Sequence, residues 1–187
     1  RDRLRSRGLG DVYKRQLSGR AWALVTGAGT GIGRSFALRL ATAGYDLVLV
    51  GQTTATLERV RDEIAAADAT ARRQVRILTM DLARTEASDE LYAAVRAMGI
   101  DVDVLVNNAG ITKDGLMVRM SEEQYDAVIA VNQKSVFNMM KLVGAVMRRQ
   151  RHGHIVSLAS VAGLYGNPGQ INYSASKAAI IGMTTSG

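Results

Sequence analysis

A tyrosine and a lysine stand four residues apart in the segment INYSASKAAI, residues 171–180. Small residues surround Tyr173 and Lys177, so neither long side chain is crowded. In a helix, residues four apart lie on one face with their Cβ atoms about 5–6 Å apart. An ammonium group at that distance favours the phenolate and lowers a tyrosine pKa from about 10 towards neutrality. The pair therefore indicates a proton donor for physiological pH, although an exposed helix face without chemistry can carry the same two residues.

A glycine-rich segment, Thr26–Gly33 (TGAGTGIG), offers a place for a ligand that carries phosphate groups. It follows the apolar run Ala21–Thr26 and opens a helical pattern, where dinucleotide-binding proteins hold a pyrophosphate. Its glycines, Gly27, Gly31 and Gly33, have the spacing G-x-x-x-G-x-G instead of the usual G-x-G-x-x-G. Glycine at these places allows a sharp turn and a close approach to the ligand. A turn that serves packing alone is the alternative.

The residue that selects between the two nicotinamide cofactors is expected about 20 positions after the glycine loop. Gly51, Gln52 and Thr53 stand there, so no carboxylate would repel a 2′-phosphate. No arginine stands there either, and Arg34 is the nearest basic candidate. The sequence therefore favours NADP(H), with NAD(H) as the alternative.

The elements that must position these residues follow from alternating apolar and helical segments. Five apolar runs predict strands, at Ala21–Thr26, Asp46–Val50, Val75–Met80, Val102–Val106 and Ile155–Leu158. Residues with helical spacing separate the runs, and a capping box of Ser121 and Gln124 predicts a long helix through Met147. This alternation predicts an α/β fold with a doubly wound parallel sheet, the Rossmann fold.

The composition limits the other function classes. The chain has 187 residues, enough for one domain, and it contains no cysteine for disulfides or thiolate metal sites. This fits a reducing cytoplasm, where we expect the protein. His152 and His154 lack a third ligand at suitable spacing, so no metal site is expected. No apolar run approaches the ~18 residues that span a membrane, so no membrane association is expected.

Most of the net charge of +7 lies in the first sixteen residues, which contain six basic and two acidic residues. A basic arm could bind nucleic acid, but Ser6–Gln16 resembles a translated transposon adapter. We therefore expect residues 1–16 to be a non-native leader and nucleic acid not to be a partner. Residues 17–187 would form a dinucleotide-binding catalytic domain. No closing strand follows the last helical pattern, so we expect the domain to be a fragment, incomplete at its C-terminus and inactive alone.

Two further motifs complete an ordered set: NNAG (Asn107–Gly110) after the fourth apolar run and SLASVAG (Ser157–Gly163) after the fifth. With the glycine loop and NYSASK (Asn172–Lys177), they make the chain similar to the short-chain dehydrogenase/reductase family from residue 21 onward. Within that family, the segments Gly110–Met120 and Gly166–Lys177 resemble the 3-oxoacyl-[acyl-carrier-protein] reductases most.

The resemblance implies a role for each of four side chains. Tyr173 would be the general acid, and Lys177 would lower its pKa and bind the nicotinamide ribose. Ser160 would hold the substrate carbonyl, whereas Ser157 does not have the right spacing from Tyr173. Asn132, a polar amide in an apolar helix, would anchor a water of the proton relay.

The resemblance also implies that Asp81 and Leu82 contact the adenine and that Asn108 contacts the ribose. The expected cofactor-binding residues are Gly27, Thr30, Gly31, Ile32, Gly33, Gln52, Asp81, Leu82, Asn108, Tyr173 and Lys177.

The function implied is an NADP(H)-dependent oxidoreductase that reduces a 3-oxoacyl thioester to the 3-hydroxyacyl product, as in fatty acid biosynthesis. Acyl carrier protein would dock near Arg151, and the whole protein would be a homotetramer or homodimer. One alternative is another ketone or secondary alcohol, such as an acyl-CoA, a sugar or a steroid. A second is a dinucleotide-binding sensor without catalysis, although the joint presence of Ser160, Tyr173 and Lys177 counts against it.

Overall fold

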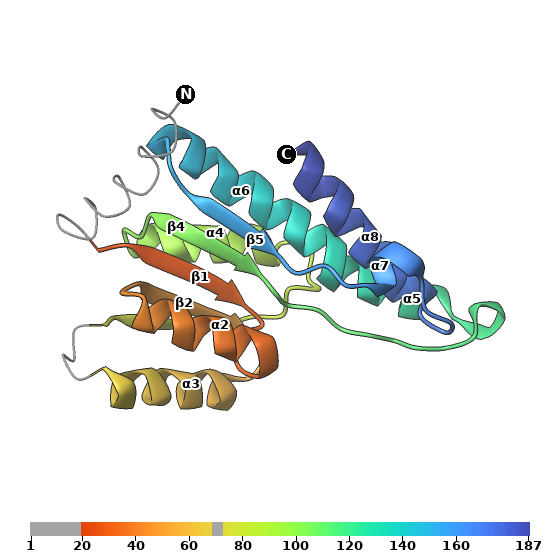
Figure 1. Cartoon of the computed structure of the whole chain (residues 1–187), viewed down its shortest axis with the longest axis horizontal. Coiled ribbons are helices and arrows are strands. Elements are labelled where there is room, and N and C mark those ends of the chain that lie inside the picture. The colour runs from red at the N-terminus through yellow and green to blue at the C-terminus, as the bar shows by residue number, and fades with distance from the viewer. Residues whose placement is uncertain (1–19, 69–72) are drawn as a thin grey trace, which may run out of the picture.

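The computed structural model describes residues 20–68 and 73–187, and the expected leader at residues 1–16 lies outside them. Five parallel strands form one sheet in the order β3-β2-β1-β4-β5 (Figure 1). The strands are β1 (Trp22–Thr26), β2 (Asp46–Gly51), β3 (Val75–Thr79), β4 (Val102–Asn107) and β5 (His154–Ser157). The five predicted strands and the doubly wound parallel sheet are confirmed, and every strand end lies within one residue of the prediction.

Helices cover both faces of this sheet. One face carries α2 (Gly31–Thr42) and α3 (Thr54–Ala67), and the other carries α4 (Ala87–Ala97) and α6 (Ser135–Gln150). Alternate residues of β1 point to opposite sides, so Val25 packs with α2 and α3 while Leu24 packs with α4 and α6. Burial on both faces explains why the central strands β1, β2 and β4 are mainly apolar. Within the described residues, none of the helices has the length and apolar character needed to span a bilayer.

The long helix predicted from Ser121 is interrupted. The predicted capping box is confirmed, because Ser121 and Gln124 each accept a hydrogen bond from the backbone of the other at the start of α5 (Glu122–Ile129). A π-helical turn, η2 (Ala130–Lys134), then leads into α6. Such turns are rare and occur frequently at functional sites, and this one contains Asn132.

The last elements carry the tyrosine–lysine pair. After β5 come a short helix, α7 (Ala162–Tyr165), and a longer one, α8 (Ile171–Ser186), which bears both residues. The segment between β4 and α5 includes a 3₁₀ turn, η1 (Met117–Arg119). α8 packs against α5, η2 and α7. The approach of α7 is so close that a Cβ on Gly163 would lie 2.7 Å from the carbonyl carbon of Lys177.

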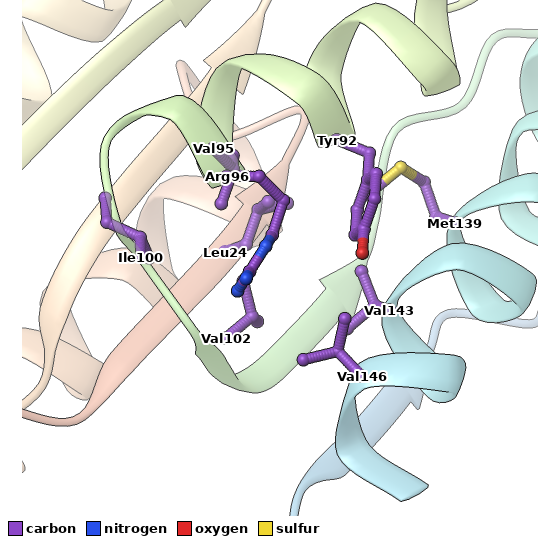
Figure 2. Close-up of a pocket in the computed structure, with 9 residues that line it drawn as sticks. All are labelled: Leu24, Tyr92, Val95, Arg96, Ile100, Val102, Met139, Val143 and Val146. Carbon is purple, nitrogen blue, oxygen red and sulfur yellow. The ribbon is translucent and has the colours of Figure 1, made fainter. Parts of the chain in front are cut away.

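A small apolar cavity lies in the core between α4, α6 and the sheet (Figure 2). Tyr92 and Val95 of α4 line it opposite Met139 and Val143 of α6. Its volume is about 10 Å³, the space of one water molecule. This cavity is a packing gap in the core, too small for a substrate or a cofactor.

At the amino ends of the strands, the buried carboxylate of Asp103 joins three elements. One of its oxygens accepts a hydrogen bond from the backbone N–H of Trp22 at 2.9 Å. The other lies 2.7 Å from Nε2 of His152, which follows α6. This contact gives His152, one of the two histidines in the sequence, a structural partner. Among residues 20–68 and 73–187, no three side chains of the metal-binding types gather into one group.

We expect Asp103→Ala to lower the free energy of unfolding by about 1–3 kcal/mol, because a buried N–H of Trp22 loses its acceptor. Asp101→Ala is the matched control, since Asp101 is largely exposed and pairs with Arg96, and exposed ion pairs contribute about 0–1 kcal/mol. Urea denaturation followed by the fluorescence of Trp22, the only tryptophan, measures both variants. Equal effects of the two substitutions would contradict the role given to Asp103.

Candidate active site

The carboxyl ends of the strands surround a hollow of about 140 Å³. Gly27 follows β1, Gln52 follows β2 and Leu82 follows β3, so three predicted cofactor contacts line one hollow. Ile111 and Val131, which the sequence analysis did not select, line it as well. Open parallel sheets bind ligands at this edge, so the hollow is a candidate cofactor site.

The glycine loop between β1 and α2 is shaped by close backbone contacts. Gly27 has a φ of +63° and Gly31 a φ of +54°, both in the left-handed region that favours glycine. A Cβ on Gly33 would lie 2.2 Å from the carbonyl oxygen of Gly27 and 2.5 Å from Nδ2 of Asn108. The loop can keep this shape only with glycine at position 33, which explains the spacing of the motif.

The N-terminus of α2 is left without a side-chain cap. Thr30 occupies the N-cap position, but its hydroxyl accepts no hydrogen bond from the first turn. Gly31, the first residue of the helix, has no side chain. The side chain of Ile32 is apolar and largely exposed, so it cannot accept a hydrogen bond as a cap. The first N–H groups of a helix need partners, and an anionic group can supply them. This terminus therefore suits a pyrophosphate.

Asn108 fastens the glycine loop to β4. Its Nδ2 donates hydrogen bonds to the carbonyl oxygens of Thr26 and Gly27, both at 3.0 Å. The hydroxyl of Thr26 accepts in turn from the backbone N–H groups of Asn108 and Ala109. Since Nδ2 has only two protons, only Oδ1 of Asn108 is left for the expected ribose contact.

Polar partners also occupy the expected adenosine end of the hollow. Gln52 donates a hydrogen bond from Nε2 to Asp81 at 2.8 Å, across the ends of β2 and β3. Arg34, the basic candidate for a 2′-phosphate, donates from Nε to Glu63 of α3 at 2.8 Å. A 2′-phosphate would therefore have to compete with Glu63 for this guanidinium group.

Asn132 lies fully buried in η2 with its amide group paired on both sides. Its Oδ1 accepts a hydrogen bond from the N–H of Ile111 at 2.8 Å, and its Nδ2 donates to the carbonyl oxygen of Ile111 at 2.9 Å. Nδ2 also donates to Oγ of Ser176 at 3.1 Å. One side chain thus joins the π-helical turn to the segment after β4 and to α8.

Lys177 is only 5% exposed, and its Nζ donates a hydrogen bond to the carbonyl oxygen of Leu158 at 2.6 Å. Nζ lies 5.7 Å from the centre of the Tyr173 ring. Burial lowers the pKa of Lys177, because desolvation disfavours the ammonium form. A Cβ on Gly110 would lie 3.3 Å from Oδ1 of Asn132 and 3.7 Å from Nζ of Lys177. The structure therefore brings Tyr173, Lys177 and Asn132 together beside the hollow that Gly110 lines.

Ser160 lies half-buried in the loop between β5 and α7. Its Oγ accepts a hydrogen bond from the N–H of Ala162 at 3.2 Å, so its own hydroxyl proton can be donated to a ligand. Ser157 differs, because its Oγ accepts from Nδ2 of Asn107 at 3.1 Å inside the sheet.

Two buried polar residues of α8 were missed by the sequence analysis. Asn172 donates from Nδ2 to the carbonyl oxygens of Lys113 and Gln124, at 3.0 and 3.3 Å, and Ser176 pairs with Asn132. Asn172 and Ser176 are four residues apart and share a helix face, as Tyr173 and Lys177 do. This second pair in the same motif is the signal that could have found them.

Comparison with known proteins gives evidence on the family of the chain that is independent of this geometry. A family model described as short chain dehydrogenase matches residues 21–187. The 3-oxoacyl-[acyl-carrier-protein] reductase of Staphylococcus epidermidis is 45% identical over 163 residues, which cover 87% of this chain and 65% of that protein. The corresponding reductase of Thermotoga maritima is 44% identical over 161 residues, 86% of this chain and 64% of that protein. The chain thus spans about 65% of the length of these curated relatives.

Other relatives carry different names. Nodulation protein G of Rhizobium sp. is 42% identical over 171 residues, which cover 91% of this chain and 66% of that protein. Among solved structures, a putative short-chain alcohol dehydrogenase from Sinorhizobium meliloti superposes with a TM-score of 0.81 at 32% identity. This match covers 89% of the chain and 64% of the solved one.

We expect Gly33→Ala to weaken dinucleotide binding, because the added methyl group would press on the carbonyl oxygen of Gly27. A cost of about 1–3 kcal/mol on the ligand-binding shape of the loop corresponds to a roughly 5- to 160-fold rise in Kd. Titration of NADPH fluorescence measures the change. Gly182→Ala is the control, since a Cβ there meets nothing within 4 Å. Unchanged binding by Gly33→Ala would show that the loop does not cradle the ligand.

Proposed function

The chain belongs to the short chain dehydrogenase family, and we propose that it reduces the ketone of a 3-oxoacyl thioester with NADP(H) as its cofactor. The observation that carries the proposal is the buried ammonium of Lys177 against the ring of Tyr173, beside the hollow at the strand ends. The names of the relatives from Staphylococcus and Thermotoga support the substrate class.

The residues around the hollow fit a nicotinamide dinucleotide. The uncapped start of α2 offers N–H groups to a pyrophosphate, and the glycine loop lets the backbone come close to it. Gln52, Asp81 and Leu82 would contact the adenosine, while Oδ1 of Asn108 and Nζ of Lys177 would contact ribose hydroxyls. The bound cofactor would supply a hydride to the carbonyl carbon of the substrate.

The proton comes from the chain itself. Ser160 donates a hydrogen bond to the carbonyl oxygen and holds it towards Tyr173. Tyr173 transfers its phenolic proton to that oxygen as the carbon is reduced, so that hydride and proton together convert the ketone to a secondary alcohol. The ammonium of Lys177 stabilises the phenolate that remains, and burial strengthens this attraction because the local dielectric constant is low.

Asn132 assists the return of a proton to Tyr173 only as an acceptor. Both protons of its Nδ2 are donated, one to Ile111 and one to Ser176. A water of the proton relay would therefore bind Oδ1 or the backbone carbonyl of Asn132, and not its amide nitrogen.

The surface next to Tyr173 suits an apolar acyl chain. A second hollow, of about 490 Å³, is lined by Met117, Ala162 and Ser174, the neighbour of Tyr173. Met117 and Ile171, which both line it, are exposed. Exposed apolar side chains at such a hollow favour a fatty acyl group over a sugar as the substrate.

A carrier protein that docks at Arg151 would lie far from the Tyr173 of the same chain. Arg151 ends α6 with a φ of +58°, at the opposite end of the helix from Asn132. A helix of 16 residues is about 24 Å long. We therefore propose that Arg151 contacts a carrier only when the thioester is delivered to a neighbouring subunit.

Tyr173→Phe tests the proposed proton donor. We expect kcat for NADPH-dependent reduction of an acetoacetyl thioester to fall about 10²–10⁴-fold, because general acid catalysis contributes that much. The Kd for NADPH should stay unchanged. The assay uses the product of the complete gene, and the control is Tyr165→Phe, whose phenol on α7 is 87% exposed. A Tyr173→Phe variant that keeps more than about a tenth of the rate would overturn the assignment.

Gln52→Asp tests the cofactor preference. The new carboxylate would repel the 2′-phosphate, so we expect the ratio of kcat/KM for NADPH to that for NADH to fall by about tenfold or more. Gln52→Asn keeps a neutral amide and serves as the control. Steady-state kinetics with both cofactors measure the ratio. A wild-type protein that already prefers NADH would contradict the assignment of NADP(H).

A further inference from the structure

We infer that Ser176 is a positioning residue for Tyr173, and that its buried hydroxyl group couples the proton donor to Asn132. The inference rests on the proposed function, because it takes Tyr173 as the proton donor. Ser176 stands between the two members of the catalytic pair, three residues after Tyr173 and one before Lys177.

The hydroxyl group of Ser176 has one partner on each side. Its side chain is 0% exposed, and its Oγ accepts a hydrogen bond from Nδ2 of Asn132 at 3.1 Å. The same Oγ donates to the carbonyl oxygen of Tyr173 at 2.7 Å. A single oxygen atom thus joins the π-helical turn η2 to the first turn of α8.

These bonds continue towards the cofactor hollow. Asn132 pairs with both the N–H and the carbonyl oxygen of Ile111, and Ile111 lines that hollow. A continuous path of hydrogen bonds therefore runs from Ile111 through Asn132 and Ser176 to Tyr173. The distance between the proton donor and the cofactor site depends on this path as well as on apolar packing.

The backbone of Tyr173 is held from both sides. Its N–H donates to Oδ1 of Asn172 at 2.7 Å, and its carbonyl oxygen accepts from Ser176. Asn172 is anchored in turn to the carbonyl oxygens of Lys113 and Gln124. Ser174 takes no part in these contacts, since its buried Oγ has no hydrogen-bond partner among the described residues.

Loss of the Ser176 hydroxyl would affect both neighbours. One N–H of Asn132 would remain buried without an acceptor, and a buried group without a partner forces its surroundings to shift. The turn that carries Tyr173 would lose its link to η2. Misplacement of a catalytic group by about 1 Å lowers a rate by on the order of 10²-fold.

The test compares Ser176→Ala and Ser176→Thr in the product of the complete gene, with NADPH and an acetoacetyl thioester. The control is Thr185→Ala, which removes an exposed hydroxyl that donates within α8. We expect Ser176→Ala to lower kcat about 10–100-fold, with little change in KM for NADPH. Its pH–rate profile should move to higher pH, because a displaced Tyr173 lies farther from the ammonium of Lys177, which the carbonyl oxygen of Leu158 keeps in place. Ser176→Thr keeps the hydroxyl and should restore most of kcat. Thr185→Ala should behave as wild type.

A double-mutant cycle shows whether Ser176 acts through Asn132. If it does, Ser176→Ala costs little further kcat in an Asn132→Ala background, whereas independent effects would multiply. Multiplying effects overturn the inference. A Ser176→Ala variant with a lower Tm but the wild-type kcat and pH profile also overturns it, because that result describes a structural role alone.

Failure of the proposed function looks different from failure of this inference. A wild-type protein that reduces no ketone, or one whose rate is unchanged by Tyr173→Phe, overturns the proposed function and the inference together. A wild-type rate that depends on Tyr173 but is the same in Ser176→Ala and Thr185→Ala overturns the inference alone.

Discussion

A buried amide needs a hydrogen-bond partner for each of its groups, and Asn132 meets this requirement by joining three segments of the chain. Its carbonyl and amide groups take up both backbone groups of Ile111, and its remaining proton goes to Ser176. Asn132 lies in the π-helical turn η2, a kind of turn found frequently at functional sites. The wall of the cofactor hollow and the start of α8 therefore depend on one residue between α5 and α6.

The candidate active site lowers the stability of the fold that carries it. Folding lowers the pKa of Lys177, so the folded protein binds this proton less readily than the unfolded chain does. The cost is fully present below the folded-state pKa and disappears as pH rises towards the unfolded value of about 10.4. The carbonyl oxygen of Leu158 offsets part of the cost. The two apolar cores on either face of the sheet offset the rest, which explains why a buried ammonium can persist beside Tyr173.

The central strands β1, β2 and β4 could be predicted from the sequence because both of their faces are buried, and their runs are therefore apolar whatever the details of packing. The edge strands β3 and β5 could also be predicted from apolar runs, although some of their residues are exposed. Tyr173 and Lys177 could be placed on one face because helical spacing is a local property. The spacing of Asn172 and Ser176 marks a second pair on one helix face, but their contacts could not be assigned, since their partners Lys113 and Asn132 lie far away in the sequence. For the same reason the apolar periodicity from Ser121 to Met147 does not reveal the π-helical turn, which contains the buried Asn132.

The cofactor side and the catalytic side of the site meet at a residue without a side chain. Gly110 lines the hollow, and a Cβ there would lie 3.3 Å from Asn132 and 3.7 Å from Lys177. The next residue, Ile111, holds the amide of Asn132 through its backbone. A ligand that displaced Gly110 would therefore move the hydrogen bonds that position α8, and a shift of α8 would alter the wall of the hollow. The proton donor and the cofactor site are thus linked through the backbone of Gly110 and Ile111. The proposed chemistry depends on this segment as directly as on the four polar side chains of Asn132, Ser160, Tyr173 and Lys177.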